Sequence, residues 1–262
     1  MSDRPGKYKD SGLLRMRNIR LTIEFDGTAY HGWQSQINAV TVQDAVTAAV
    51  NALTGEDCSL SGSSRTDAGV HALGYVCNFH TQSSIPADKF AFALNTLLPE
   101  DIVIKCSQEV PDDFHARFSA RGKTYRYLIY NSVFPTALMR KRAYHIYYPL
   151  DITVMQAAAA QFVGTHDFYA FSAAGGSVKT TVRTITAATV LRQNPDDNLI
   201  ALNITGDGFL YNMVRIIAGT LIEVGIGKLK PDDIPELIFG MDRRKAGRTA
   251  PAHGLYLVEV YY

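Results

Sequence analysis

Apolar and polar side chains alternate along several short segments of the chain, as in strands that bury one face of a sheet. Residues 18–25 (Asn-Ile-Arg-Leu-Thr-Ile-Glu-Phe) show this alternation clearly. Similar patterns predict six further strands, at residues 73–81, 102–110, 123–130, 182–192, 199–205 and 255–262.

Other segments carry apolar residues at helical spacing. Thr41 is a predicted N-cap for a helix over residues 42–53, which ends at Gly55. Asp151 is a predicted N-cap for a helix from residue 152 to about residue 163. Further helices are predicted at residues 87–98, 211–224 and 231–239.

The order of these elements predicts an α+β protein. Helices alternate with strands in each half, yet several strands follow one another without a helix between them, which favours two ferredoxin-like halves with mainly antiparallel sheets. We expect a mobile tail at residues 1–18, one half at 19–115 and the other at 116–262, with the boundary near residues 111–121. A cleft between two such halves is a natural site for a large ligand.

Composition excludes several classes of protein. The chain has 262 residues, a net charge of +1 and three widely spaced cysteines without a C-x-x-C pair. This cysteine usage argues against a disulfide framework and fits a reducing, cytoplasmic environment. The charged N-terminus contains no signal-peptide core, and no apolar run is long enough to cross a bilayer.

Charge is unevenly distributed along the chain, although the total is only +1. Residues 117–145 contain seven basic and no acidic residues, interleaved with tyrosines, and residues 243–248 form a second basic cluster. Such a mixture suits contact with RNA phosphates and stacking on bases, although a solvent-exposed strand explains either cluster equally well. The candidate phosphate contacts are Arg121, Lys123, Arg126, Arg140, Lys141, Arg142, Arg243 and Arg244.

Motifs for metals, nucleotides and serine hydrolases are absent from the sequence. The histidines never occur as H-x-x-x-H, so we expect no metal site. The segment Gly225-Ile-Gly-Lys228 lacks the full phosphate-loop pattern and reads as a helix C-cap, so no nucleotide cofactor is expected. No G-x-S-x-G elbow accompanies Ser63 and Ser64, and His71 is interpreted as structural.

One acidic residue lies in an unusually bare loop. Asp67 follows a Ser/Gly-rich approach and precedes Ala68 and Gly69, so no bulky side chain covers its carboxylate. Read alone, Asp67 is most simply a turn residue. Its context changes this interpretation.

Three motifs in this order resemble the tRNA pseudouridine synthase family of the TruA type. They are residues 64–72 (Ser-Arg-Thr-Asp-Ala-Gly-Val-His-Ala), 122–127 (Gly-Lys-Thr-Tyr-Arg-Tyr) and 206–215 (Gly-Asp-Gly-Phe-Leu-Tyr-Asn-Met-Val-Arg). Residues 23–34 and 250–257 also resemble that family's opening and closing segments, so the resemblance covers residues 19–262.

The resemblance implies isomerisation of uridine to pseudouridine in the anticodon stem-loop of tRNA, at positions 38, 39 and 40. The uracil is detached from N1, rotated and rejoined through C5, which needs neither cofactor nor metal. It also implies a homodimer in which one tRNA touches both subunits. A non-catalytic RNA-binding or chaperone module is the alternative that the basic and aromatic residues leave open.

The resemblance assigns roles to individual residues. Asp67 is the catalytic nucleophile, and Arg215 is the cation beside it. Tyr125 stacks on the target base, Arg65 enters the stem as the uridine flips out, and Leu255 packs against the target ring.

The chain departs from the family pattern at Ser64, where Gly is usual. A serine would be strained there if the turn required a positive φ.

Overall fold

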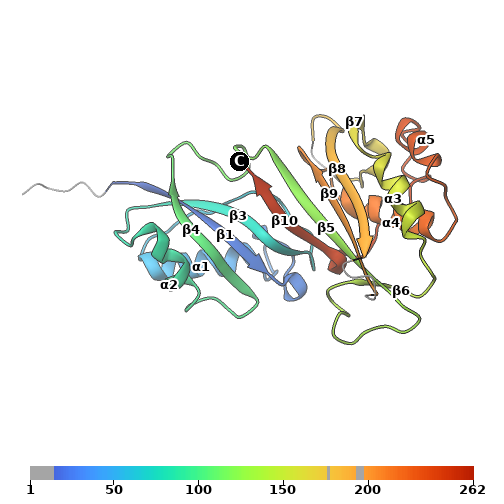
Figure 1. Cartoon of the computed structure of the whole chain (residues 1–262). Helices are drawn as coiled ribbons and strands as arrows, with labels where there is room; N and C mark the ends of the chain where they lie inside the picture. The colour runs from blue at the N-terminus through green and yellow to red at the C-terminus, as the bar shows by residue number, and fades with distance from the viewer. Residues whose placement is uncertain (1–14, 176–177, 193–197) are drawn as a thin grey trace, which may run out of the picture.

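One continuous sheet crosses the molecule (Figure 1). The computed structural model describes residues 15–175, 178–192 and 198–262, and within them ten strands join in one sheet. The strand order is β4-β1-β3-β10-β5-β9-β8-β7, with β2 paired to β3 and β6 to β5. The strands are β1 (Arg17–Phe25), β2 (Ser61–Gly62), β3 (His71–Thr81), β4 (Ile102–Val110), β5 (Gly122–Asn131), β6 (Tyr144–Ile146), β7 (Gly164–Asp167), β8 (Val182–Arg192), β9 (Leu199–Gly206) and β10 (Leu255–Tyr261).

Helices pack at both ends of this sheet. In Figure 1, α1 and α2 lie with β4, β1 and β3, whereas α3, α4 and α5 lie with β9, β8 and β7. Their bounds are α1 (Val42–Thr54), α2 (Phe90–Leu94), α3 (Ile152–Ala160), α4 (Met213–Gly225) and α5 (Asp233–Phe239). Within the described ranges, no helix is long and apolar enough to span a bilayer.

The predicted α+β class with a mainly antiparallel sheet is confirmed, but the sheet is shared between the predicted halves. The closing strand β10 pairs in parallel with β3, at Tyr256↔His71 and Leu257↔Ala72. Its other edge pairs antiparallel with β5. The last strand of the chain therefore joins the two sets of strands, a long-range pairing that local sequence patterns do not specify.

The N-terminal boundary of the sheet lies before the predicted one. Most of the predicted tail, residues 1–14, lies outside the described part of the chain. Arg17, which we assigned to the tail, belongs to β1, and so does Asn18, at which the predicted strand begins. Asn18 is fully buried and donates hydrogen bonds to the backbone oxygens of Pro111 and Phe114. It therefore ties the first strand to the segment that leads into β5.

The predicted helix starts at residues 41 and 151 are confirmed. The hydroxyl of Thr41 accepts a hydrogen bond from the Asp44 N–H, and the Asp151 carboxylate accepts one from the Val154 N–H. At the other end of α1, Gly55 adopts φ +73°, the left-handed conformation expected of a C-cap glycine.

Two predicted helices differ from the observed ones for local reasons. The helix predicted from residue 211 starts at Met213, because Asn212 adopts φ +60° and interrupts the right-handed backbone before it. The helix predicted over 87–98 is a 3₁₀ turn (Ala87–Lys89) followed by the short α2. The Asn95 side chain bonds the backbone N–H and carbonyl of Ile104, which fixes the chain in a turn after α2.

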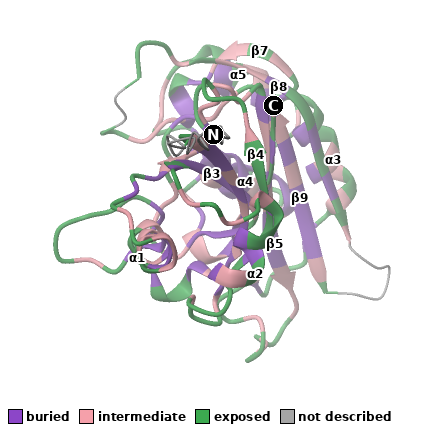
Figure 2. Ribbon diagram, turned by 90° about the vertical axis from the view of Figure 1, so that its left-hand side faces the viewer, coloured by how far each residue is buried: buried purple, intermediate pink, exposed green. Residues whose placement is uncertain are grey.

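The two faces of the central strands have different partners. Figure 2 shows buried residues concentrated in the strands, with exposed residues in the loops. On β5, Tyr125 and Tyr127 face the main core, and their partners on β10, Leu257 and Leu255, share that face. Arg126 and its partner Tyr256 lie on the opposite face.

Replacing Asp151 tests the cap of α3 without disturbing the core, because this side chain is exposed. Asp151→Ala leaves the Val154 N–H without its acceptor and should lower the free energy of unfolding by about 1 kcal/mol. Asp151→Asn retains an acceptor oxygen and should cost much less. Urea denaturation of the three proteins measures the difference, and equal losses in both variants would contradict the capping role.

Candidate active site

A tight turn presents Asp67. The Val70 N–H donates to the Asp67 carbonyl oxygen (3.1 Å), and Gly69 at the third position of this turn has φ +78°. That conformation strains residues with a Cβ, so glycine is required there. The turn leaves the Asp67 side chain 29% exposed.

A second loop, residues 27–33, supports this turn by close backbone contact. A Cβ on Gly32 would lie 2.0 Å from the Thr66 carbonyl oxygen, and one on Gly27 would lie 1.9 Å from that of Val70. In addition, the Trp33 N–H donates to the Thr66 hydroxyl (2.9 Å). The opening motif of the sequence therefore packs directly against the loop that carries Asp67.

Asp67 pairs with Arg215, as the resemblance implied. Arg215 Nη1 lies 2.6 Å from Asp67 Oδ2, and the arginine side chain is 16% exposed. The guanidinium also donates to Asn212 Oδ1 (2.7 Å) and to the Ala250 carbonyl oxygen (2.8 Å). Arg215 is thus fixed by three acceptors, and one of them is the candidate nucleophile.

Tyr125 approaches the same loop from β5. Its hydroxyl lies 3.2 Å from Ser64 Oγ, and its ring packs edge-on against Phe209 with centroids 5.2 Å apart. Burial and the nearby Asp67 carboxylate raise the pKa of Tyr125, so its phenol keeps its proton at neutral pH. Only 7% of Tyr125 is exposed.

The closing motif completes this group of residues. Ala250, which binds Arg215, leads through a 3₁₀ turn (Ala252–Gly254) into Leu255 at the start of β10. The Tyr127 hydroxyl donates to the Pro251 carbonyl oxygen (2.7 Å) and holds this turn. Gly254 is needed there, because a Cβ would lie 2.6 Å from the Tyr127 ring.

The backbone at Ser64 is not strained. Among the described residues, positive φ outside glycine occurs at Asn38, Asn212 and Met241. Ser64 therefore adopts an ordinary backbone conformation, and its serine side chain causes no strain. Arg65, the next residue, is exposed and makes no hydrogen bond or ion pair with another described residue.

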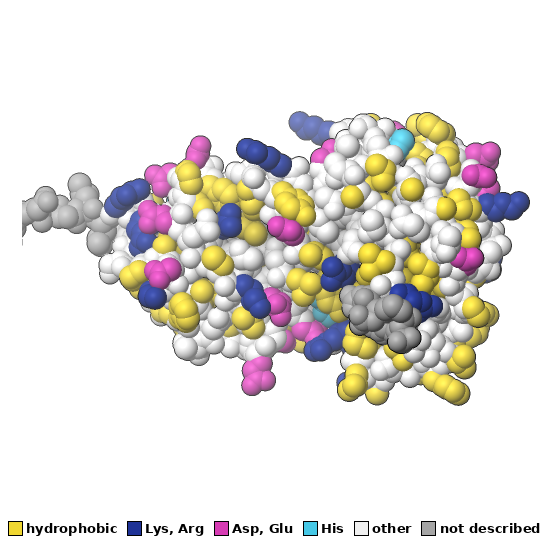
Figure 3. Space-filling model, in the orientation of Figure 1, with side chains coloured by type: hydrophobic (Ala, Val, Ile, Leu, Met, Phe, Trp, Pro, Cys, Tyr) yellow, Lys and Arg dark blue, Asp and Glu magenta, His cyan; other side chains and the backbone are white. Residues whose placement is uncertain are grey.

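The predicted phosphate contacts fall into two groups. Arg121, Arg140, Lys141, Arg142 and Arg244 are exposed, although Arg244 also pairs with the Asp242 carboxylate (2.8 Å). Others are engaged within the protein. Arg126 binds Asn203 on the sheet face opposite Tyr125, and Arg243 binds two backbone carbonyls and the Thr249 hydroxyl. On the face seen in Figure 3, basic and acidic side chains are interspersed, so no continuous basic surface covers it.

Lys123 points at the Asp67 loop. Its Nζ donates to the Ser63 carbonyl oxygen (2.9 Å), and burial together with Arg117 lowers the pKa of the ammonium to about 8. Because β5 alternates, Lys123 and Tyr125 lie on the same face. Lys123 therefore holds the Asp67 loop through the Ser63 carbonyl oxygen. Its position in the sequence did not indicate this contact.

His71 joins three segments on the other face, as the structural interpretation expected. Its Nε2 lies 2.9 Å from the Lys141 carbonyl oxygen, and its Nδ1 accepts from the Gly27 N–H (3.0 Å). Burial lowers the pKa of His71, and these partners require the neutral tautomer with the proton on Nε2. Its contact with Asp26 is therefore not an ion pair at neutral pH, although the two side chains are 3.1 Å apart.

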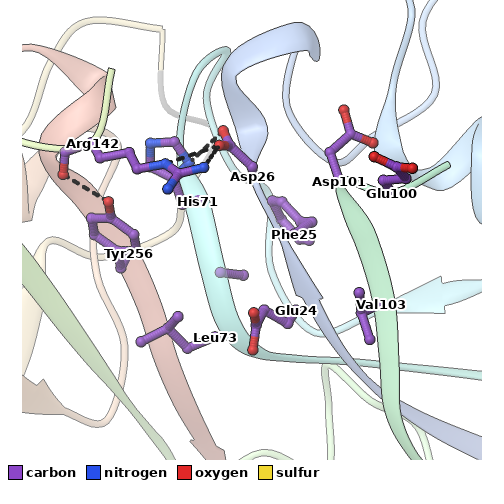
Figure 4. Close-up of a pocket in the computed structure, with 11 residues that line it drawn as sticks. Glu24, Phe25, Asp26, His71, Leu73, Glu100, Asp101, Val103, Arg142 and Tyr256 are labelled. Carbon is purple, nitrogen blue, oxygen red and sulfur yellow. Dashed lines mark hydrogen bonds and ion pairs between the residues drawn. The ribbon is translucent and has the colours of Figure 1, made fainter. Parts of the chain in front are cut away.

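A cavity of about 400 Å³ opens beside His71 (Figure 4). Four carboxylates line it, from Glu24, Asp26, Glu100 and Asp101. Arg142, a predicted phosphate contact, lies here and pairs with Asp26 (3.1 Å). An anionic RNA backbone does not suit this cavity, and the Asp26 carboxylate compensates the charge of Arg142.

No group of three or more His, Cys, Asp or Glu side chains suitable for a metal ion occurs within the described residues. The site consists instead of a carboxylate, a guanidinium and an aromatic ring brought together by three sequence-distant segments. This arrangement suits covalent catalysis on a planar base by a carboxylate.

Comparison with known families assigns the class of protein. A family profile described as tRNA pseudouridine synthase matches residues 21–119 and 158–262, and the chain belongs to this family. It is therefore an isomerase that converts uridine to pseudouridine in tRNA. A non-catalytic RNA-binding module is not favoured.

Individual relatives are similar over almost the whole chain. The chain is 62% identical to the tRNA pseudouridine synthase A of Acetivibrio thermocellus over 247 residues, which are 94% of this chain and all of the relative. It is 59% identical to that of Ruminiclostridium cellulolyticum and 54% identical to that of Caldicellulosiruptor bescii, with the same coverage.

Sequence reasoning missed the residues that support the site. Asn212 and the Ala250 carbonyl orient Arg215, and the fully buried Tyr75 binds the backbone of Ser64. Asn212 and Ala250 lie within motifs that were quoted for the resemblance, but no local pattern indicates which residues contact Arg215.

The ion pair between Asp67 and Arg215 predicts that lysine cannot replace Arg215 without loss of activity. Arg215→Lys keeps the charge but cannot reach Asp67, Asn212 and the Ala250 carbonyl together, because an ammonium lacks the planar fork of donors. Pseudouridine formation should fall on the order of 10²-fold. Single-turnover assays with tRNA measure this loss, and circular dichroism controls for folding. A lysine variant with unimpaired turnover would show that charge alone suffices.

Proposed function

We propose that this enzyme modifies uridines 38, 39 and 40 in the anticodon stem-loop of tRNA, with Asp67 as the nucleophile after the uridine has been flipped out of the stem. The observation that carries the role of Asp67 is its 2.6 Å contact with Arg215, beside the buried Tyr125. The family membership supports the substrate class.

The contact with Arg215 suits a carboxylate that works away from water. Enclosing an ionised carboxylate under a base removes its hydration, and a cation at hydrogen-bond distance compensates for this loss. The same cation can stabilise Asp67 again when it leaves the covalent intermediate. Attack at C6 of the base, attack at C1′ of the sugar and removal of a sugar proton are the three routes open to this group.

The neighbouring residues suit the flipped nucleotide. Tyr125 offers a ring for stacking, and Leu255 adds an apolar contact on the same sheet face. Arg65 is exposed, two residues before Asp67, and can fill the space that the base vacates. Extrusion of a base costs on the order of a few kcal/mol, which contacts of this kind must offset.

A nucleophile variant tests the proposal. Asp67→Asn keeps the size of the side chain but removes the charged nucleophile, so pseudouridine formation should fall about 10⁴-fold or more. Affinity for tRNA should change little, because phosphate contacts dominate binding. The assay is to incubate the protein with an unmodified tRNA transcript and map pseudouridine along it.

The control is Asp26→Asn, which alters a carboxylate on the opposite face and should leave turnover largely intact. Conversion by Asp67→Asn at the wild-type rate would contradict the role of Asp67. Pseudouridine at positions other than 38–40 would contradict the proposed target alone.

We also infer a homodimer that binds one tRNA across both subunits, located in the cytoplasm where tRNA acts. The net charge of +1 gives one chain little long-range attraction for RNA, and two subunits present their exposed basic residues together. One chain has a mass of 28.8 kDa, and light scattering of the free protein should give about twice this mass. A monomeric mass that persists with tRNA bound would contradict this inference.

A further inference from the structure

A side-chain hydrogen bond joins the loop that carries Asp67 to the hydroxyl of Tyr125. Ser64 lies three residues before Asp67, and its Oγ is 3.2 Å from the Tyr125 hydroxyl. Within the described residues this is the one hydrogen bond of that hydroxyl. The contact links the proposed nucleophile's loop to the proposed stacking residue, which come from segments 61 residues apart.

The backbone around Ser64 is fixed, so its Oγ has a defined position. The Tyr75 hydroxyl donates to the Ser64 carbonyl oxygen (2.6 Å) and accepts from the Ser64 N–H (3.3 Å). Tyr75 is itself fully buried and stacks on Trp33 with ring centroids 4.0 Å apart. On the preceding residue, Lys123 binds the Ser63 carbonyl oxygen.

Either hydroxyl can donate in this contact, because the Tyr125 phenol and the Ser64 side chain each carry one O–H and can each accept. A buried hydroxyl without a partner is unfavourable, so removing Ser64 Oγ should change the preferred orientation of the ring. The ring also packs edge-on against Phe209 and belongs to the main core.

We propose that Ser64 is a positioning residue for the isomerisation: its hydroxyl holds the Tyr125 ring at a fixed place relative to Asp67. The inference rests on the proposed roles of Asp67 and Tyr125. It also gives Ser64 a function at the position where the sequence departs from glycine. Fixing two groups that act on the same base lowers the entropic cost of reaching the reactive geometry.

Kinetics of single and double variants test the proposal. Ser64→Ala should lower kcat about 3- to 10-fold, the effect of one hydrogen bond, and leave the KM for tRNA nearly unchanged. Adding Ser64→Ala to Tyr125→Phe should cause almost no further loss, because the partner hydroxyl is already absent. Ser63→Ala is the matched control, since it removes the same hydroxyl from the neighbouring residue, and the buried Ser63 hydroxyl makes no hydrogen bond with Tyr125.

A spectroscopic measurement tests the contact without the reaction. In the free protein labelled with ¹³C at tyrosine Cζ, the Tyr125 signal should shift in Ser64→Ala and stay in place in Ser63→Ala. A Tyr125 signal that does not shift in Ser64→Ala would overturn the proposal. So would a double variant whose loss of kcat equals the product of the losses in the two single variants. Failure of the wild-type protein to form pseudouridine at 38–40 would instead overturn the proposed function, because the Tyr125 signal does not depend on RNA.

Discussion

The insertion of the last strand between two earlier ones is the constraint on which the structure depends. β10 pairs with β3 on one edge and β5 on the other, so the strand that follows the Asp67 loop and the strand that carries Tyr125 are spaced by a single strand. The hydrogen-bonded spacing between neighbouring strands is about 4.8 Å, which fixes the separation of these two segments. The hydrogen bonds from β5 to this loop, at Tyr125 and Lys123, form across that separation.

The same strand also brings in the cation. The segment that leads into β10 includes Ala250, whose carbonyl oxygen accepts from Arg215 and whose N–H donates to the Arg215 carbonyl oxygen. Close packing fixes this segment against α4, because a Cβ on Gly219 would lie 1.8 Å from the Arg248 carbonyl oxygen. The pairing of Asp67 with Arg215 thus follows from backbone contacts that leave no room for larger residues.

Most helices and strands could be predicted from the apolar pattern and cap residues of their own segments, whereas contacts between distant segments could not. The alternation at residues 102–110 and 182–192 predicted β4 and β8 with their observed bounds, because each strand has one buried face. The cap residues Thr41 and Asp151 bind backbone groups three residues further on, so the starts of their helices could also be predicted from the local sequence. The single shared sheet depends on pairing between residues more than a hundred positions apart, which no window of sequence contains.

The candidate site shows the same division. Asp67, Arg215 and Tyr125 were assigned through resemblance, and the structure brings all three together. Basic residues were grouped by sequence proximity alone, which did not indicate that the side chains of Arg126 and Arg243 form hydrogen bonds within the protein. Strand alternation turns Arg126 to the opposite face, and Arg243 binds carbonyls of its own loop. A count of charges does not tell which side chains fold back on the protein.

The four-residue interval from Asp67 to His71 shows how one motif acts on both faces of the sheet. Asp67 meets Arg215 on the side of Tyr125, whereas His71 stacks on Tyr256 and binds Lys141 on the other side. A neutral imidazole suits this second role, because its two nitrogens match one donor and one acceptor of the backbone. The motif therefore presents a reactive carboxylate while its last polar side chain fixes the loops behind it, and the turn at Gly69 lets the chain change faces between them.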